Sequence, residues 1–373
     1  MIDEDLGRPT WCDIDLGAIG RNVEAIQDHV GVPVMPVIKA DAYGHGAVRV
    51  AGHLEAMGVS VVGVAYVEEA IALRRAGIGL GIHVLGGAVE RQVPLFIDHD
   101  LTFTAPSIDK LRQINAVAAG RGARAQVHLK IDTGMERIGV HHYNAAALIE
   151  ASLECESVDV EGIFSHFATS DAADLDPSKR QLERFHDAVS HYDRLGIPTP
   201  TRHMANSGAV AQLADSWLDM VRPGLIVFGV WPSEETERTI PLQSALAWRS
   251  EVVFFKVVEA GSPVSYGSTW TPDRQVRIVT VPVGYGDGYR RSLSNAAEML
   301  IGGKRRQVVG RVCMDQTMVN LDWGSAFNGD AVTLVGSDGD QKITVEDLAT
   351  WGDTIPYEVL TSITSRVPRR YRI

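Results

Sequence analysis

Cysteine, long apolar runs and excess positive charge are all scarce in this sequence of 373 residues. Its three cysteines, Cys12, Cys155 and Cys313, are far apart and form no C-x-x-C pattern, so we expect reduced structural thiols. No stretch approaches the roughly 18 consecutive apolar residues that a membrane-spanning helix requires. The formal net charge of -12 argues against a nucleic acid or an anionic membrane as the main partner, because both need basic patches.

Internal repeats and low-complexity segments are also absent from the sequence. Hydrophobic residues make up 45% of the chain and charged residues 22%, which is typical of globular proteins. The length favours one large domain accompanied by a smaller one. The first ten residues, MIDEDLGRPT, are acidic and polar, where a secretory signal would be basic and then apolar. We therefore expect a soluble protein of the cytoplasm.

Short β-branched runs alternate with longer amphipathic stretches over the first two thirds of the chain, which is typical of repeated strand and helix units. Eight runs are strand candidates, and eight parallel strands predict a closed (β/α)8 TIM barrel. Helical patterns lie between them, for example over residues 67–77 and 177–196. The eight candidates span residues 32–39, 59–67, 81–86, 101–105, 125–132, 159–167, 201–207 and 224–229.

After Pro241 the pattern changes to period-two segments separated by tight turns, which predicts a β-rich second domain. Gly302 and Gly303 mark a hairpin turn, and residues 345–364 contain two short helical patterns. The predicted organisation has three parts: an N-terminal strand over residues 1–12 that joins the β domain, the barrel over residues 13–240, and the β-rich domain over residues 241–373.

Polar residues end several of the predicted strands, where barrels of this type place their catalytic groups. Lys39 ends the first strand, and Tyr43 lies four residues later, where the first turn of a helix would stack the two side chains. A desolvated lysine readily loses its proton and can condense with an aldehyde, although an ion-paired structural lysine is the alternative. The other polar strand ends are Lys130, His166, Asn206 with Ser207, and Arg222.

The last two predicted strands carry features of a phosphate site. Ser207 follows an apolar strand, and the free backbone N–H groups of Gly224 and Leu225 follow Arg222. Phosphate sites in barrels typically lie after strands seven and eight, where small residues allow main-chain N–H groups to approach the oxygens. An aldehyde-reactive lysine combined with a phosphate site predicts pyridoxal 5′-phosphate as the cofactor.

Nine motifs occur in the order found in bacterial alanine racemases, and the sequence resembles that family over nearly its whole length. They are PVIKADAYGHG, HLKIDTGMERIG, FSHFATSD, HMANSGA, RPGLIVFG, PVSYG, VPVGYGDGY, GRVCMDQ and PYEVL. The resemblance implies a homodimer of barrel-plus-β-domain subunits that acts on the small amino acid alanine, with each active site shared between the two subunits.

The resemblance also assigns the residues that bind the cofactor. Lys39 would hold pyridoxal phosphate as a Schiff base, and Arg222 would contact the pyridine nitrogen where many such enzymes place a carboxylate. His166 would hydrogen-bond to Arg222. The phosphate would be bound by Tyr43, Ser207, Gly224, Leu225 and Tyr357.

The reaction that the resemblance implies is two-base proton transfer at the substrate Cα. Lys39 would act on one face, and Tyr266 from the partner subunit on the other. Arg137 would bind the substrate carboxylate together with the N–H of Met314 from the partner. Lys130 would be carbamylated and orient Arg137; an unmodified lysine paired with an acid is the alternative. Residues that match the family's substrate channel are Tyr285 and Asp171.

Interconversion of L- and D-alanine, which supplies D-alanine for peptidoglycan, is therefore the expected function. A serine or broad-specificity racemase of the same family is the main alternative. Related pyridoxal-phosphate decarboxylases are expected to place a carboxylate where this chain has Arg222, and non-enzymatic single-domain barrels lack the segment that carries Tyr266. We expect no metal site, because His45, His141 and His142 lack ligand spacing.

Overall fold

The computed structural model describes residues 7–373, which form two compact units. One unit contains the described residues up to Ala18 together with Gln243–Ile373, and the other contains Ile19–Leu242. Residues 1–6 of the predicted N-terminal strand lie outside the described residues. The first strand, β1, spans Thr10–Asp15 and pairs with strands of the first unit.

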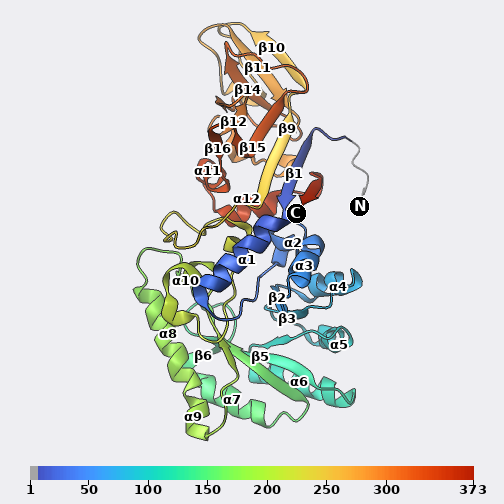
Figure 1. Ribbon diagram of the computed structural model, residues 1–373, viewed down its shortest axis with the longest axis vertical. Helices are drawn as coiled ribbons and strands as arrows, with labels where there is room; N and C mark the ends of the chain where they lie inside the picture. The colour runs from blue at the N-terminus through green and yellow to red at the C-terminus, as the bar shows by residue number, and fades with distance from the viewer. Residues whose placement is uncertain (1–6) are drawn as a thin grey trace. The chain divides into compact units, whose positions relative to one another are not determined.

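The unit formed by Ile19–Leu242 is the predicted barrel, with all of its strand pairs parallel (Figure 1). Short bridges complete the ring: Val37 pairs with Gly63, and Val34 pairs with Val221, which joins the first strand segment to the last. Its strands are β2 (Val61–Val64), β3 (Gly81–Val84), β4 (Phe103–Ala105), β5 (Ala125–Asp132), β6 (Val140–His141), β7 (Val158–Phe164) and β8 (Thr201–His203).

The helices that connect these strands include the two predicted segments in modified form. The pattern over residues 67–77 is α4, whereas the pattern over residues 177–196 is divided into α8 and α9 at Ser190, whose hydroxyl bonds back to the carbonyl of Asp187. The helices are α1 (Leu16–Val30), α3 (Ala47–Ala56), α4 (Val67–Arg75), α5 (Val93–Asp98), α6 (Ile108–Gly120), α7 (Ala145–Leu153), α8 (Asp176–Val189), α9 (His191–Leu195) and α10 (Ser207–Gln212). None of the helices within residues 7–373 is both long enough and apolar enough to cross a lipid bilayer.

The prediction of the eighth strand over residues 224–229 is wrong. The extended segment that closes the barrel lies earlier, at Met220 and Val221, and the apolar run that follows is a 3-10 helix over Leu225–Phe228. Pro223 lacks an N–H for a strand ladder, and Gly224 turns the chain with φ -112° and ψ -85°. All four side chains of the 3-10 helix are fully buried, so burial alone did not distinguish it from a strand.

The β-rich unit contains a sheet in the order β13-β12-β15-β9-β1-β17, in which β1 lies beside β9 (Figure 1), and a three-stranded sheet in the order β10-β11-β14. Gly302 and Gly303 form the predicted hairpin turn with positive φ angles, as such turns require. The remaining elements are β9 (Leu246–Glu251), β10 (Phe254–Val258), β11 (Val276–Val281), β12 (Glu298–Ile301), β13 (Lys304–Gln307), β14 (Thr317–Asp322), β15 (Ala331–Asp338), β16 (Gln341–Ile343), β17 (Arg369–Arg372), α11 (Val345–Trp351) and α12 (Pro356–Ser362).

Candidate active site

Lys39 begins a single left-handed turn, α2 (Lys39–Tyr43), at the end of the first strand segment. The four residues that follow the lysine, from Ala40 to Tyr43, have φ angles between +52° and +55°. Side chains on Cβ make this conformation unfavourable by roughly 1–2 kcal/mol per residue, and such strain is concentrated at functional sites. The turn after Lys39 is therefore left-handed, unlike the first turn of an ordinary helix.

A carboxylate from α4 holds this strained turn in place. Glu69 accepts a hydrogen bond from the Ala40 N–H at 2.6 Å through one oxygen. Its other oxygen accepts from the N–H groups of Ala65 at 2.7 Å and Tyr66 at 3.0 Å, just beyond β2. No local sequence pattern identifies this role of Glu69, because its partner Ala40 is 29 positions away in the chain.

The Lys39 amine is tuned by its surroundings. Partial burial, followed by the positive charge of Arg137, lowers its pKa, and the negative charge of Glu69 partly opposes this shift. A lysine that releases its proton more easily is a better base near neutral pH.

Tyr43, Ser207 and Gly224 are brought together by the fold. Gly224 donates its N–H to Ser207 Oγ at 2.9 Å, so this N–H is not free as predicted. A Cβ at Gly224 would lie only 2.3 Å from the hydroxyl oxygen of Tyr43, so only glycine allows the backbone this close. Leu225 follows directly and is fully buried. The hydroxyls of Tyr43 and Ser207, next to the backbone of Gly224, which carries no side chain, form a site that fits a phosphate group.

Arg222 is a buried cation of the barrel, with 3% of its surface exposed. Its Nη1 donates to His203 Nδ1 at 2.7 Å, and its Nη2 donates to the carbonyls of Ser165 at 2.8 Å and Met204 at 3.2 Å. His166 Nδ1 lies 3.3 Å from the same Nη2, so the structure brings the predicted pair together. Within residues 7–373 no carboxylate forms an ion pair with Arg222. Arg222 is therefore a donor suited to an acceptor such as a neutral pyridine nitrogen.

Lys130 and Arg137 line one small cavity together with His166. Lys130, at the end of β5, is buried, and burial followed by the charge of Arg222 lowers its pKa well below the usual range. In the described part of the chain Lys130 makes no ion pair, although the negative charge of nearby Asp132 partly opposes the lowering of its pKa. Asp132 orders the loop before Arg137 by accepting the N–H groups of residues 134–137 at 2.8–3.2 Å.

Tyr266 lies in a loop of the β-rich unit that hydrogen bonds hold in shape. Val264 and Trp270 bridge the base of the loop, and Ser265 adopts a positive φ of 66° while its hydroxyl donates to the carbonyl of Arg311 at 2.6 Å. The tyrosine side chain is 71% exposed. A strained loop that presents an exposed aromatic ring is suited to contact another molecule.

The other predicted site residues occupy defined positions in their own units. In the β-rich unit, the carbonyl of Met314 accepts from the Gly286 N–H at 2.9 Å, which holds its loop beside Tyr285, and Met314 is 52% exposed. Tyr357 is the second residue of α12 and is half-buried. Asp171 belongs to the barrel unit, where its backbone carbonyl accepts hydrogen bonds from Ser233 and Thr236.

Three buried histidines of the barrel predict a loss of stability in acid. Burial is the main cause that lowers the pKa of His128 to about 3 and those of His83 and His203 well below the usual range. In the unfolded chain histidine has a pKa of about 6.5, so at lower pH only the unfolded state takes up these protons. The unfolding free energy should then fall by about 1.4 kcal/mol per pH unit for each histidine.

Thermal unfolding measured between about pH 7.5 and 5 tests this expectation. The His83→Leu variant should show a shallower decline of Tm with falling pH than the parent protein. His186 is exposed on α8, so the matched His186→Gln variant should keep the parental slope. Equal slopes in all three proteins would contradict the prediction.

The chain is similar in sequence to known proteins. The family model "Alanine racemase, N-terminal domain" matches residues 14–232, and "Alanine racemase, C-terminal domain" matches residues 245–371. Alanine racemase 2 of Caldanaerobacter subterraneus is 41% identical over 375 residues, which cover 100% of this chain and 96% of the relative.

Solved structures agree with this similarity. The alanine racemase from D-cycloserine-producing Streptomyces lavendulae is 34% identical, with a TM-score of 0.93 over 98% of this chain and 97% of that one. The alanine racemase from Bacillus anthracis with bound L-Ala-P is 33% identical, with a TM-score of 0.91 over 98% and 95% of the two chains.

Proposed function

The chain belongs to the alanine racemase family and interconverts L- and D-alanine with pyridoxal 5′-phosphate, and we propose that Lys39 and Tyr266 exchange the proton at Cα. The observation that carries this proposal is the grouping of Lys39, the Tyr43–Ser207–Gly224 cluster and Arg222 in one barrel. When bound, pyridoxal phosphate stabilises the negative charge that remains on the substrate Cα after its proton leaves.

We propose the following ligands for the cofactor. Lys39 holds the cofactor covalently, and Tyr43, Ser207, Gly224 and Leu225 bind its phosphate. Tyr357 is proposed as a further phosphate ligand from the β-rich unit. The contact between His166 and Arg222 supports the assignment of Arg222 to the ring nitrogen, where a guanidinium that keeps its proton leaves the nitrogen unprotonated.

Proton transfer takes place on the two faces of the substrate. The lowered pKa of Lys39 supports its role as the base on one face. Tyr266 acts on the opposite face, where its phenol gives or takes the second proton. Removal on one side followed by return on the other inverts the stereocentre.

Substrate recognition depends on the carboxylate of alanine. Arg137 binds this group with the N–H of Met314, and Tyr285 and Asp171 line the channel by which alanine arrives. Lys130 is proposed to be carbamylated: a neutral amine can react with carbon dioxide, and its lowered pKa favours the neutral form. The resulting anion would orient Arg137, which lines the same cavity.

The protein is proposed to act as a homodimer in which Tyr266 and Met314 complete the site of the partner subunit. The exposure of both side chains, 71% and 52%, supports this proposal. A role of D-alanine in peptidoglycan supply follows from the product. Cytoplasmic localisation and the absence of a nucleic acid or membrane partner stay predictions.

The test is incubation of the purified protein and pyridoxal phosphate with L-alanine in D2O, with L-serine and L-lysine in parallel. We expect optical rotation to decay to zero as deuterium enters Cα, and to do so much faster for alanine. The Lys39→Ala variant should lose both signals, whereas Lys179→Ala, at an exposed position on α8, should keep them. Faster turnover of serine would favour the serine racemase alternative, and unchanged rotation of all three amino acids would contradict racemisation.

A further inference from the structure

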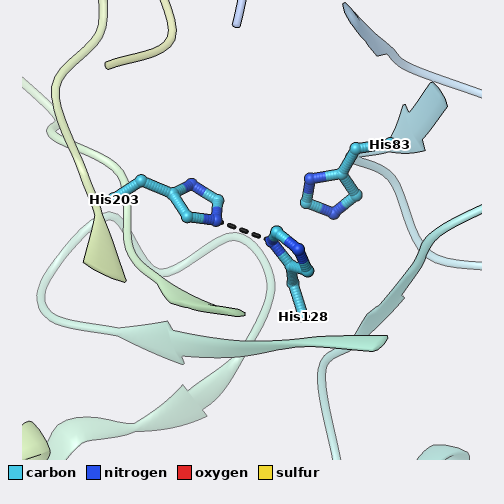
Figure 2. A group of neighbouring side chains, drawn as sticks. All are labelled: His83, His128 and His203. Carbon is cyan, nitrogen blue, oxygen red and sulfur yellow. Dashed lines mark hydrogen bonds between the residues drawn. The ribbon is translucent and has the colours of Figure 1, made fainter. Parts of the chain in front are cut away.

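Three imidazoles from three different strands meet inside the barrel (Figure 2). His83 lies on β3, His128 on β5 and His203 on β8, and all three are buried. One ring nitrogen of each lies within 4.8 Å of the others. The proposed reaction does not use these three side chains.

The positions of the imidazole hydrogens on His203 and His128 follow from the hydrogen bond that Arg222 donates. A guanidinium can only donate, so His203 Nδ1, 2.7 Å from Arg222 Nη1, must accept. A neutral His203 then carries its hydrogen on Nε2. That nitrogen lies 2.7 Å from His128 Nδ1, which must accept in turn, so the hydrogen of His128 is on Nε2.

The tautomer of His83, at the opposite end of the cluster, is determined by Thr104. Its hydroxyl donates to the carbonyl of Val84 at 2.8 Å, so it accepts from His83 Nε2 at 3.0 Å. His83 Nδ1 is left as a buried acceptor that has no partner within residues 7–373. The rings of His83 and His128 are in contact, with centroids 4.3 Å apart.

Metal binding is the competing interpretation of three clustered histidines, and two observations oppose it. Two imidazole nitrogens on one tetrahedral zinc ion would be separated by about 3.3 Å, whereas those of His128 and His203 are at hydrogen-bond distance. Arg222 and Lys130 also lie close to the cluster, and each contributes to lowering the pKa of His83 and His203. A divalent cation would be repelled at this position unless a carboxylate compensated for its charge.

The backbone is adapted to the position of His128. The pairing of β5 and β7 shifts register after Val127, so that Val127 faces Val160 and His128 faces Gly162. A Cβ at Gly162 would lie 2.5 Å from His128 Nδ1. The irregular pairing and the glycine together allow the imidazole to reach His203.

We propose that His83, His128 and His203 form a series of neutral imidazoles with fixed tautomers, and that they are positioning residues that hold Arg222 as a hydrogen-bond donor. Hydrogen bonds join His128 and His203 to Arg222, and the ring of His83, which is bonded to Thr104, packs against His128, so the cluster ties the guanidinium to three barrel strands. The value of this arrangement for racemisation rests on the proposed contact of Arg222 with the cofactor. The hydrogen bonds within the cluster are independent of that contact.

The first experiment measures the tautomers directly in the full-length protein by 15N NMR of labelled histidines, with and without pyridoxal phosphate. The signals are assigned by single substitution of each histidine. We expect His83, His128 and His203 to remain neutral with hydrogen on Nε2 from about pH 5.5 to 8.5. An Nδ1–H tautomer, protonation within this range, or joint displacement of the three signals by Zn²⁺ would overturn the proposal. This measurement does not depend on racemase activity.

The second experiment separates positioning from simple packing. His128→Leu should lower kcat by roughly 10- to 100-fold, because a small displacement of a group that contacts the cofactor is costly. His128→Asn offers an amide oxygen as an acceptor for His203 and should recover most of the lost kcat and the Nε2–H signal of His203. Equal kcat values for the Leu and Asn variants would contradict the positioning role, and the exposed His186→Gln variant serves as the control.

Discussion

Co-expression of the Lys39→Ala and Tyr266→Phe variants should restore racemase activity, although each variant alone should be almost inactive. In a mixed dimer with shared sites, one site carries both substitutions and the other combines an intact Lys39 with an intact Tyr266. Random assembly gives mixed dimers half of the time, each with one intact site of two, so about a quarter of the wild-type activity is expected.

The separate variants provide the reference for this experiment. Loss of either proton-transfer group should reduce kcat by roughly 10²- to 10⁴-fold, the range for general acid–base catalysis. The matched control is co-expression of the Lys39→Ala chain with a chain that carries both substitutions. Neither chain then has an intact Lys39, so this mixture should remain inactive. If mass spectrometry finds mixed dimers but activity stays at the level of the separate variants, each site is formed within one subunit and the dimer proposal fails.

A methyl group at Gly224 should weaken cofactor binding. The added Cβ would lie 2.3 Å from the hydroxyl oxygen of Tyr43, and this ring is buried against Phe228 at a centroid distance of 5.3 Å. Overpacking of this kind costs about 1–3 kcal/mol, which corresponds to roughly 5- to 150-fold in affinity. We expect Gly224→Ala to raise the Kd for pyridoxal phosphate by that factor in an absorbance titration.

The control for this substitution is Gly120→Ala. Gly120 ends α6, and a Cβ there would meet no atom within 4 Å, so the Kd should not change. An unchanged Kd in Gly224→Ala would show that the backbone at this position does not approach the cofactor, and the phosphate assignment would then be wrong.

Local sequence patterns were sufficient for most of the barrel and for the position of Lys39. Alternation of strand and helix patterns predicted the parallel barrel, and paired glycines at 302 and 303 predicted a hairpin. These features depend on residues close together in the chain. The prediction of the eighth strand was wrong because a fully buried run such as Leu225–Phe228 shows the same apolar pattern in a strand and in a 3-10 helix.

The residues of the turn after Lys39 gave no local indication that the turn is left-handed. Alanine and tyrosine disfavour positive φ angles, and only aspartate adopts them more readily, so the local preference points the other way. The conformation depends on Glu69, whose carboxylate arrives from another strand–helix unit. Glu69 could have been suspected only if its distance in space from Ala40 had been known.

The amino-acid sequence specified which chemical groups are available: a lysine at a strand end, small residues beside a hydroxyl, an arginine at another strand end, and the order of nine family motifs. Their protonation and direction were decided by the folded chain. Burial lowers the pKa of Lys39 and Lys130, and the tautomer of His128 depends on His203, 75 positions away. Desolvation and hydrogen-bond direction depend on neighbours in space, which only folding brings together.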